Sequence, residues 1–239
     1  MRAKISTLLL ILCIGLFTSC SFQLKPSKKI ITRQYNVTNF SAIKLEMIGN
    51  VEFTQSAKCG VEIKGPENYV KLFKVTVENG TLCISNMKNM HLGSDNTKML
   101  KITISAPSLT NIRSKGVGNI NIGKLNVQNL EVINNGVGDI NIDSISGSSL
   151  SINSLGVGNI NIKGTVHVAS LTCSGVGDIN ADKLQAKVVD ANCRGVGSIT
   201  CFAIDSMTAA VKGVGSIKYK GKPGFKDISS SEVGSVKEY

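Results

Sequence analysis

The chain has 239 residues and a net charge of +11, and only 5% of its residues are aromatic. The basic residues are scattered along the sequence, which argues against a nucleic-acid-binding protein and favours an outer surface that tolerates anionic surroundings. No stretch after residue 19 reaches about 18 consecutive apolar residues, so the sequence predicts no transmembrane helix.

Residues 1–19 have the pattern of a secretion signal. Arg2 and Lys4 provide a basic start, residues 8–17 form an apolar run, and small residues precede Cys20. Such a segment is too short and wrongly flanked for a membrane span. Its end resembles a bacterial lipobox, so we predict cleavage before Cys20 and lipidation of that cysteine. A plain signal peptide cleaved elsewhere is the alternative. Removal of Arg2 and Lys4 would lower the net charge to +9.

Residues 20–34 are expected to form a short, basic, lipidated tether, and residues 35–106 a β-rich cap with the first coils of a larger fold. Residues 47–53 resemble a decayed copy of the motif that fills the second half of the chain. Residues 67–72 are expected to form a single helical turn. An Asn-Gly pair within residues 75–84 joins two alternating runs, which is a strong signal for a β-hairpin.

Residues 107–239 repeat one motif, Gly-Val-Gly-Asn/Asp-Ile-Asn-Ile. Clear copies lie at residues 116–122, 136–142 and 156–162, looser copies begin at Gly175, Gly195 and Gly213, and a worn copy lies at residues 232–236. Successive copies begin 18 to 20 residues apart. A fixed period of this size is the signature of a solenoid in which each repeat forms one coil and stacks on its neighbours.

Each repeat has the alternation of polar and apolar residues that is typical of β-strands. Asn-Ile-Asn-Ile has period two, and a second alternating run precedes each pair of glycines. A weaker third strand is expected at residues 125–127, 166–168 and 184–188. We therefore predict an all-β fold, a parallel β-solenoid with about 20 residues per coil and an irregular β-rich N-terminal cap. A β-sandwich is the alternative, although it would not need a constant repeat length.

Stacking of the coils would place equivalent residues in columns. We expect the isoleucines of the motif to point inward and the valines from Val117 to Val214 to form a second inward column. Asn121, Asn141, Asn161 and Asn180 should form an outward ladder of amide hydrogen bonds. Glycine adopts positive φ without penalty, so the paired glycines are expected to form corners. These glycines are Gly116, Gly118, Gly136, Gly138, Gly156, Gly158, Gly175, Gly177, Gly195, Gly197, Gly213 and Gly215.

The signal with its lipobox, the cap with its Asn-Gly hairpin and the recurring Gly-Val-Gly-Asn/Asp-Ile-Asn coils resemble the putative auto-transporter adhesin head GIN domain family of Bacteroidetes-type bacteria. The resemblance covers residues 35–239. It implies a right-handed parallel β-helix-like fold, a location in the cell envelope and a role in adhesion. The family supplies no catalytic residues to carry over. The later copies depart from the motif at Ser198 and Ser216, so a ligand function of those coils does not follow from the resemblance.

Asp139 and Asp178 form a candidate ligand column, because they occupy the same position of the motif. They alternate with asparagines and would lie two coils apart, at about 9.5 Å. Calcium needs about six to eight oxygen ligands, so a solvated ladder explains these aspartates better than a calcium site or a catalytic pair. Neither His91 nor His167 has the spacing to other ligands that is typical of zinc. We therefore predict no metal, no cofactor and no catalytic residue.

Five cysteines remain once Cys13 is removed with the signal and Cys20 is lipidated. They are Cys59, Cys83, Cys173, Cys193 and Cys201. Their scatter is unlike that of a disulfide scaffold. Cys173 and Cys193 share one position of the repeat, so we expect them to lie in contact in adjacent coils, as free thiols more than as a strained bridge.

Two classes of function remain open at this point. We favour a non-enzymatic, lipid-anchored protein of the bacterial cell envelope, facing the periplasm or the cell surface, that binds a glycan or an envelope protein. The alternative is a polysaccharide-cleaving enzyme on a β-helix scaffold, which would need acidic and basic side chains converging on one face. Self-assembly through the open ends of the coils is a third option, although Lys237 and Glu238 end the last coil and are expected to discourage strand addition at that edge.

Overall fold

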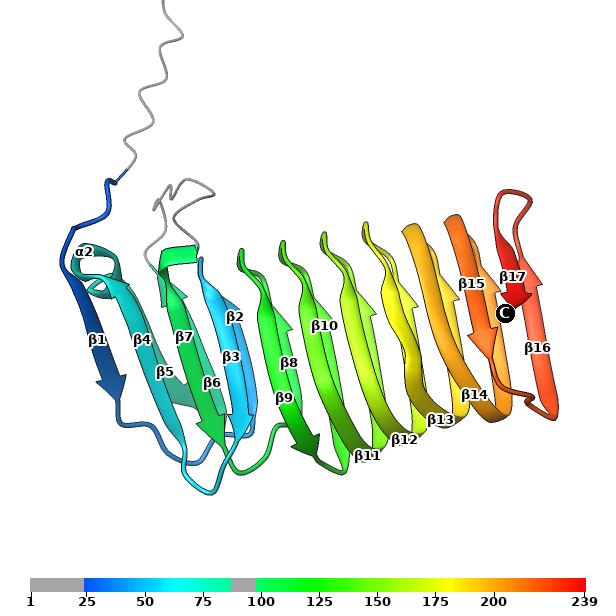
Figure 1. Ribbon diagram of the computed structural model, residues 1–239, viewed down its shortest axis with the longest axis horizontal. Helices are drawn as coiled ribbons and strands as arrows, with labels where there is room; N and C mark the ends of the chain where they lie inside the picture. The colour runs from blue at the N-terminus through cyan, green and yellow to red at the C-terminus, as the bar shows by residue number, and fades with distance from the viewer. Residues whose placement is uncertain (1–23, 87–97) are drawn as a thin grey trace, which may run out of the picture.

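The computed structural model describes residues 24–86 and 98–239. Its coils stack along one axis as a β-solenoid, with a less regular cap at the N-terminal end (Figure 1). The predicted signal, Cys20 and His91 lie outside the described residues. Within the described residues, no helix is long and apolar enough to span a membrane.

The N-terminal region contains mostly antiparallel strands that surround the first coil. Its elements are β1 (Ile30–Tyr35), β2 (Ala42–Glu46), β3 (Asn50–Gln55), β4 (Gly60–Pro66), α2 (Glu67–Val70), β5 (Phe73–Glu78), β6 (Thr81–Asn86) and β7 (Lys101–Ala106). α2 confirms the single helical turn. β5 and β6 form the expected hairpin, in which Asn79 and Gly80 have φ of 49° and 72°, as a two-residue turn of this type requires.

The solenoid begins within this region, as the decayed motif copy predicts. β2 and β3 pair in parallel with β8 (Asn111–Ser114) and β9 (Ile120–Asn126), respectively, and Ile48 between them bridges to Val117. β6 and β7 pair in parallel with the opposite edges of β2 and β3. The segment between β3 and β8 is therefore an insertion that folds back to cover the first coil.

The remaining strands build the regular coils, and every pairing among them is parallel. They are β10 (Asn129–Asn134), β11 (Ile140–Ser154), β12 (Ile160–Cys173), β13 (Ile179–Cys193), β14 (Val196–Val211), β15 (Val214–Lys220), β16 (Phe225–Ser230) and β17 (Ser235–Glu238). Ile140 pairs with Ile160, Ile160 with Ile179, and Ile179 with Ile199. This register confirms the parallel β-solenoid and its repeat of about 20 residues.

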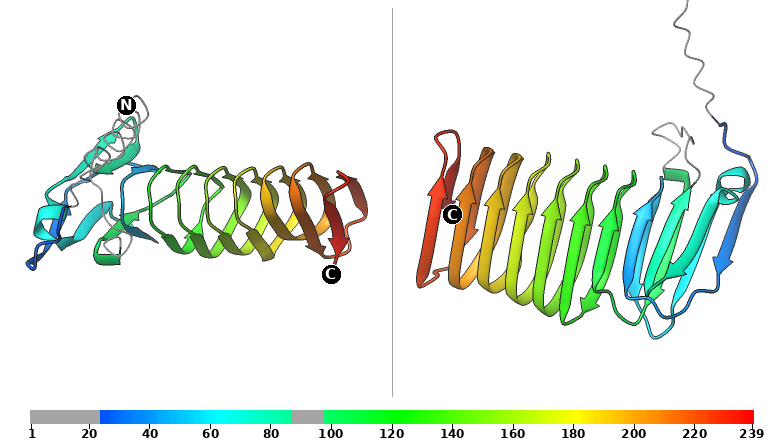
Figure 2. Two further views of the ribbon diagram at one scale, coloured as in Figure 1. Left: turned by 90° about the horizontal axis from the view of Figure 1, so that it is seen from above. Right: turned by 180° about the vertical axis from the view of Figure 1, so that it is seen from behind.

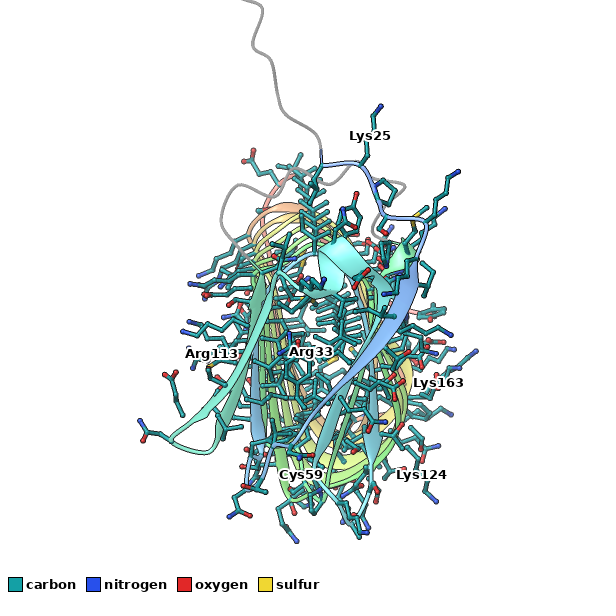
Figure 3. All side chains as sticks on the ribbon, turned by 90° about the vertical axis from the view of Figure 1, so that its left-hand side faces the viewer. Lys25, Arg33, Cys59, Arg113, Lys124 and Lys163 are labelled. Atoms are coloured by element: carbon teal, nitrogen blue, oxygen red, sulfur yellow. The ribbon has the colours of Figure 1, made fainter. Side chains whose placement is uncertain are left out.

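The expected third strand does not form as a separate element. Residues 166–168 lie inside β12 and residues 184–188 inside β13, because the strands from β11 to β14 are 14 to 16 residues long and continue through a bend. Shifts of register mark this bend, for example between Ile142 and Ile145. Each coil thus has two long faces, joined by the glycines at one end and by the far bend, in the middle of β11 to β14, at the other (Figures 2 and 3).

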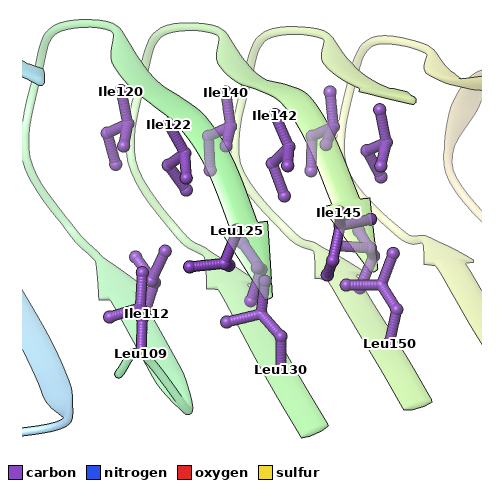
Figure 4. Packing of buried hydrophobic residues seen from close by; sticks show 14 of the residues in the cluster. Leu109, Ile112, Ile120, Ile122, Leu125, Leu130, Ile140, Ile142, Ile145 and Leu150 are labelled. Atoms are coloured by element: carbon purple, nitrogen blue, oxygen red, sulfur yellow. The ribbon is translucent and has the colours of Figure 1, made fainter. Parts of the chain in front are cut away.

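The core is a set of continuous columns between the two faces. Ile120 and Ile140 occupy the same position in neighbouring coils, and so do Leu130 and Leu150 from the opposite face (Figure 4). Each of these side chains is at most 4% exposed. Burial of one such side chain stabilises the fold by roughly 1.5–3 kcal/mol. A single coil cannot bury these side chains alone, so the stacking of coils provides this stabilisation.

Candidate binding surfaces of the solenoid

The paired glycines form a tight corner for two different physical reasons. In every pair except the last, Gly213 and Gly215, the second glycine adopts a φ that side-chain-bearing residues rarely adopt, for example 136° at Gly138 and 134° at Gly158. The first glycine is needed for close approach. A Cβ atom on Gly156 would lie only 2.0 Å from the carbonyl oxygen of Gly136 in the coil below. The corners of successive coils are therefore in direct backbone contact.

The corner valines point outward, so the expected inward column of valines is wrong. They are 41–58% exposed and are bridged to one another from coil to coil. Strict alternation explains their direction, since counting back three residues from the buried Ile120 places Val117 on the opposite side. We call this row the valine ridge, and it consists of Val117, Val137, Val157, Val176, Val196 and Val214.

The surroundings of the valine ridge make it prominent. Glycines stand on both sides of each valine, so no neighbouring side chain of the same coil covers it. The residue before each corner is also exposed in most coils, and this adjoining row contains Lys115, Leu155, Arg194 and Lys212. The glycine corner is thus an apolar ridge with basic side chains along one flank.

The column of Asp139 and Asp178 holds the corners together. The backbone N–H of Asn159 donates to Oδ1 of Asp139 at 2.8 Å, and the N–H of Asp178 donates to Oδ1 of Asn159 at 2.9 Å. Ser198 repeats the contact to Asp178 at 2.7 Å. The position needs an oxygen acceptor, which both Asp and Asn supply. Asp139 and Asp178 stay in separate coils, and the described residues contain no group of three side chains suited to a metal ion.

The four motif asparagines form the outward ladder that the sequence predicts. Nδ2 of Asn141 donates to Oδ1 of Asn121 at 2.9 Å, and Asn161 and Asn180 continue the chain at 2.7 and 2.9 Å. Each amide has one more N–H and one more lone pair than the ladder uses. We call this row, Asn121, Asn141, Asn161 and Asn180, the asparagine ladder.

A shallow hollow of about 230 Å³ adjoins the asparagine ladder, and its walls include Lys163, Asp182 and Lys183. Nζ of Lys220 lies 2.9 Å from a carboxylate oxygen of Asp182. This hydrogen bond lowers the pKa of Asp182, so the hollow combines a fixed carboxylate with two lysines. Lys163 and Arg113 project from opposite faces of the coils (Figure 3).

A second hollow, of about 280 Å³, lies on the cap and has no signal in the sequence, because its residues come from three distant strands. Gln34 and Tyr35 of β1 face Glu62 of β4 and Thr103 of β7. The Tyr35 hydroxyl is buried without a hydrogen-bond partner, and burial raises its pKa. The Arg33 guanidinium lies 4.9 Å from the centroid of the Tyr35 ring.

Cys173 and Cys193 lie side by side as expected, paired in register in adjacent coils. Both thiols are buried and free, and each donates to a glycine carbonyl four residues on, at 3.3 Å. Burial raises the pKa of Cys173 to about 11 and that of Cys201 to about 12. These cysteines therefore act as small core residues and are poor nucleophiles. His167 is exposed on β12.

Comparison with known proteins identifies the family. Residues 39–223 match the family described as "Putative auto-transporter adhesin, head GIN domain". The chain belongs to this family. A crystal structure of a putative adhesin from Bacteroides fragilis is 43% identical, with a TM-score of 0.88, and the match covers 90% of this chain and all of that chain. No functionally curated protein matches the chain significantly.

Two more distant solved structures show the same fold. A putative adhesin from Parabacteroides merdae is 20% identical with a TM-score of 0.67, and a protein named putative lipid binding protein from Parabacteroides distasonis is 23% identical with a TM-score of 0.68. Each match covers 91% of this chain and 99% of the other. Membership of the GIN domain family supports an adhesin-like role at the cell envelope or surface.

Proposed function

We propose that this GIN domain protein is a non-enzymatic, lipid-anchored envelope protein that binds a glycan of regular repeat along the asparagine ladder. The observation that carries this proposal is the constant spacing of the ladder, which presents one amide per coil at intervals of about 4.8 Å. An envelope protein with a row of polar groups is the other partner compatible with this surface.

The chemistry of the ladder suits an extended polar ligand. Each amide retains one donor and one acceptor, so a polymer with regularly placed hydroxyl groups gains about 0.5–1.5 kcal/mol per matched hydrogen bond. Several weak contacts along the row add up, although each one alone exchanges with water. Lys163 and Lys183 at the adjoining hollow would favour polymers that also carry carboxylate or phosphate groups.

The placement of the acidic residues supports binding over catalysis. A polysaccharide-cleaving enzyme needs a base or acid of suitable pKa close to a second catalytic group. Asp139 and Asp178 accept backbone N–H groups in separate coils and serve the corner. Asp182 is paired with Lys220. No observation in the described residues favours the enzyme hypothesis over a binding surface.

The start of the described chain supports an anchor near the domain. Residues 24–29 are held against α2, where Asn68 donates to the Lys25 carbonyl at 2.8 Å and accepts from the Ser27 N–H at 2.9 Å. The Tyr69 hydroxyl of α2 donates to the Leu24 carbonyl at 2.5 Å, so a lipid on Cys20 would be attached only four residues before a fixed point of the fold. Mass spectrometry of the native amino-terminal peptide tests this part, and an unmodified terminus or cleavage elsewhere would disprove the anchor.

The binding proposal is tested with the mature protein and a panel of envelope polysaccharides and proteins. The double variant Asn141→Ala/Asn161→Ala should lose most of the binding, because it interrupts the ladder at its centre. Asn192→Ala is the matched control, since Asn192 projects from the opposite face and hydrogen-bonds Asp190 of its own strand. Equal binding by the double variant and the wild type would refute the role of the ladder.

A further inference from the structure

The valine ridge is an unusual concentration of exposed apolar side chains. Among the described residues, fifteen large hydrophobic side chains are exposed, and the six valines of the ridge are among them. Val233, at 73% exposure, follows Val214 at the repeat distance of 19 residues, and Leu155 beside the ridge is 47% exposed. With Val233, the row extends over six coil steps, or about 29 Å. An apolar row of this length calls for a partner.

The ridge and the start of the described chain lie on the same edge of the molecule. In Figure 1 and in the right panel of Figure 2, α2 and the segment that leads into β1 are at the top, where the glycine corners form a row along the solenoid. Figure 3, viewed along the solenoid, places Lys25 at this same edge and Cys59 near the opposite one. Four residues of extended chain reach at most about 14 Å. A lipid on Cys20 would thus bring a bilayer to the valine ridge and not to the far bend.

The charges at this edge fit an anionic membrane surface. The row beside the ridge contains Lys115, Arg194 and Lys212 and no acidic residue from Val117 to Val214, and the exposed Glu232 beside Val233 is an acidic residue at the last coil. Residues 25–29 add three lysines. Glu67 in α2 is paired with two lysines, at 3.3 and 3.0 Å. The aspartates of the corner column use a carboxylate oxygen to accept backbone N–H groups.

We propose that the valine ridge docks on the surface of a bilayer that contains anionic lipids, so that the solenoid lies lengthwise on the membrane. The proposal rests on the lipid anchor of the proposed function and extends it. One lipid chain gives reversible membrane binding, and stable binding requires a second signal. The ridge supplies apolar contact along the whole solenoid, and the basic residues of its flank, at the first coil and in the last coils of the row, supply attraction to anionic headgroups.

This orientation would leave the rest of the surface free for other partners. The asparagine ladder lies on the strand segments that lead away from the glycine corners. The far bend lies at the edge opposite the corners (Figure 1), so it would point away from the bilayer. A domain fixed only through its tether could present any side to the cell exterior. Docking along the ridge instead fixes which faces remain accessible.

The sequence offers a clean probe, because the chain contains no tryptophan. Val157→Trp places a single fluorophore in the middle of the ridge, and Val168→Trp places one at another exposed valine, near the far bend. The mature lipidated variants are reconstituted in vesicles of phosphatidylglycerol and phosphatidylethanolamine with brominated acyl chains. We expect a blue shift and loss of most of the fluorescence for Val157→Trp and neither change for Val168→Trp.

Flotation of the same samples separates this inference from the proposed anchor. Variants that float with the vesicles while Val157→Trp is not quenched would overturn ridge docking and leave the anchor intact. Equal quenching of both tryptophans would also overturn it. A failure to float would disprove the anchor and ridge docking together. A blue shift of Val157→Trp that grows with protein concentration without vesicles would show that a second copy covers the ridge instead, which also overturns docking.

Discussion

At the scale of single residues, stacking gives each position of the motif one environment that recurs in every coil. Ile160 is fully buried between Ile140 and Ile179, while Asn161 is outward and hydrogen-bonded to Asn141 and Asn180. Two adjacent residues in one strand therefore stabilise the fold by different means. Ile160 fills a continuous apolar column. Asn161 makes hydrogen bonds at the surface that water molecules could replace.

Replacement of these two residues should have unequal effects on stability. Ile160→Ala opens a cavity between intact neighbours and should lower the free energy of unfolding by about 2–5 kcal/mol. Asn161→Ala removes ladder hydrogen bonds at a surface position and should lower it by only about 1 kcal/mol. Urea unfolding of both variants measures the difference. Similar midpoints for the two variants would contradict the observed in/out arrangement.

The buried thiols should be unreactive in the folded protein. Cys173, Cys193 and Cys201 are buried, whereas Cys59 and Cys83 are half-exposed. Alkylation at about pH 8, read out by peptide mass spectrometry, should therefore label only Cys59 and Cys83 until the protein is unfolded in urea. Rapid labelling of Cys173 in the folded protein would show that the solenoid opens at this coil.

The buried thiols should also make the stability of the folded state decrease at high pH. Burial raises the pKa of Cys173 from its ordinary value of 9.0 to about 11, so the folded state retains a proton that the unfolded state has already released. This contribution to stability is complete below pH 9 and is lost as the pH rises toward 11. Cys173→Ala/Cys201→Ala should show a smaller loss of stability over this range than the wild type.

The residue types of the motif predicted correctly which side chains of most columns point inward or outward. The outward direction of the corner valines became clear only from the structure. Valine usually indicates a buried position. Ile120 and Val117 are separated by a glycine that adopts a φ of 138°, and whether alternation continues through such a residue is not evident from the sequence. The hollow around Tyr35 was also beyond prediction, because its residues meet only after the insertion folds back on the first coil.

At the scale of elements, the glycine corner determines how closely the coils can stack. The column of Asn and Asp side chains fastens each corner to the next through backbone N–H groups, while the glycines keep the space between them free. The sequence predicted the corner and its spacing because both are local and repeated. It overestimated the number of strands, since a bend within a continuous strand has the same alternation as two strands.

Replacement of glycine by alanine should destabilise the fold at a corner glycine but not at a glycine elsewhere in a strand. Gly158→Ala combines a φ of 134° with a Cβ 2.3 Å from the Gly138 carbonyl oxygen, so it should destabilise the fold by at least about 3 kcal/mol. Gly123→Ala is the matched control, because its nearest neighbour would lie 4.0 Å away and its φ is not in the left-handed region. That variant should be neutral or stabilising by up to about 1 kcal/mol. A well-folded Gly158→Ala variant would contradict the backbone contact.

The aspartates of the corner column should be replaceable by asparagine. Asn119 and Asn159 already accept the same backbone N–H contact with an amide oxygen. The double variant Asp139→Asn/Asp178→Asn should therefore keep its melting temperature, with or without calcium. A calcium-dependent rise in the melting temperature of the wild type that disappears in this variant would instead establish a metal site at the corner.

At the scale of the whole molecule, a solenoid has two open ends that must be protected from further stacking. β1 and the insertion together cover the N-terminal end with antiparallel pairings, and β1 pairs only with β4. At the C-terminal end, β16 pairs only with β14 and β17 only with β15. Charged residues occupy this last coil. Lys226 pairs with the buried Met207, and its Nζ lies 5.9 Å from the centroid of the Tyr219 ring.

Removal of these end charges should cause the molecules to assemble end to end. Lys226 takes an inward position that is apolar in the preceding coil, and Glu238 accepts a hydrogen bond from the Tyr219 hydroxyl at 3.3 Å. The variant Lys226→Val/Lys237→Val/Glu238→Val would leave an apolar terminal coil with unpaired backbone groups, a template for added strands. Light scattering should show a molar mass that rises with concentration above that of the wild type.

Lys187→Val is the matched control, because it changes charge and hydrophobicity on the exposed side of β13 without altering the end of the solenoid, and it should behave as the wild type. A triple variant with the mass of the wild type at every concentration would mean that the shape of the last coil, and not its charge, prevents assembly.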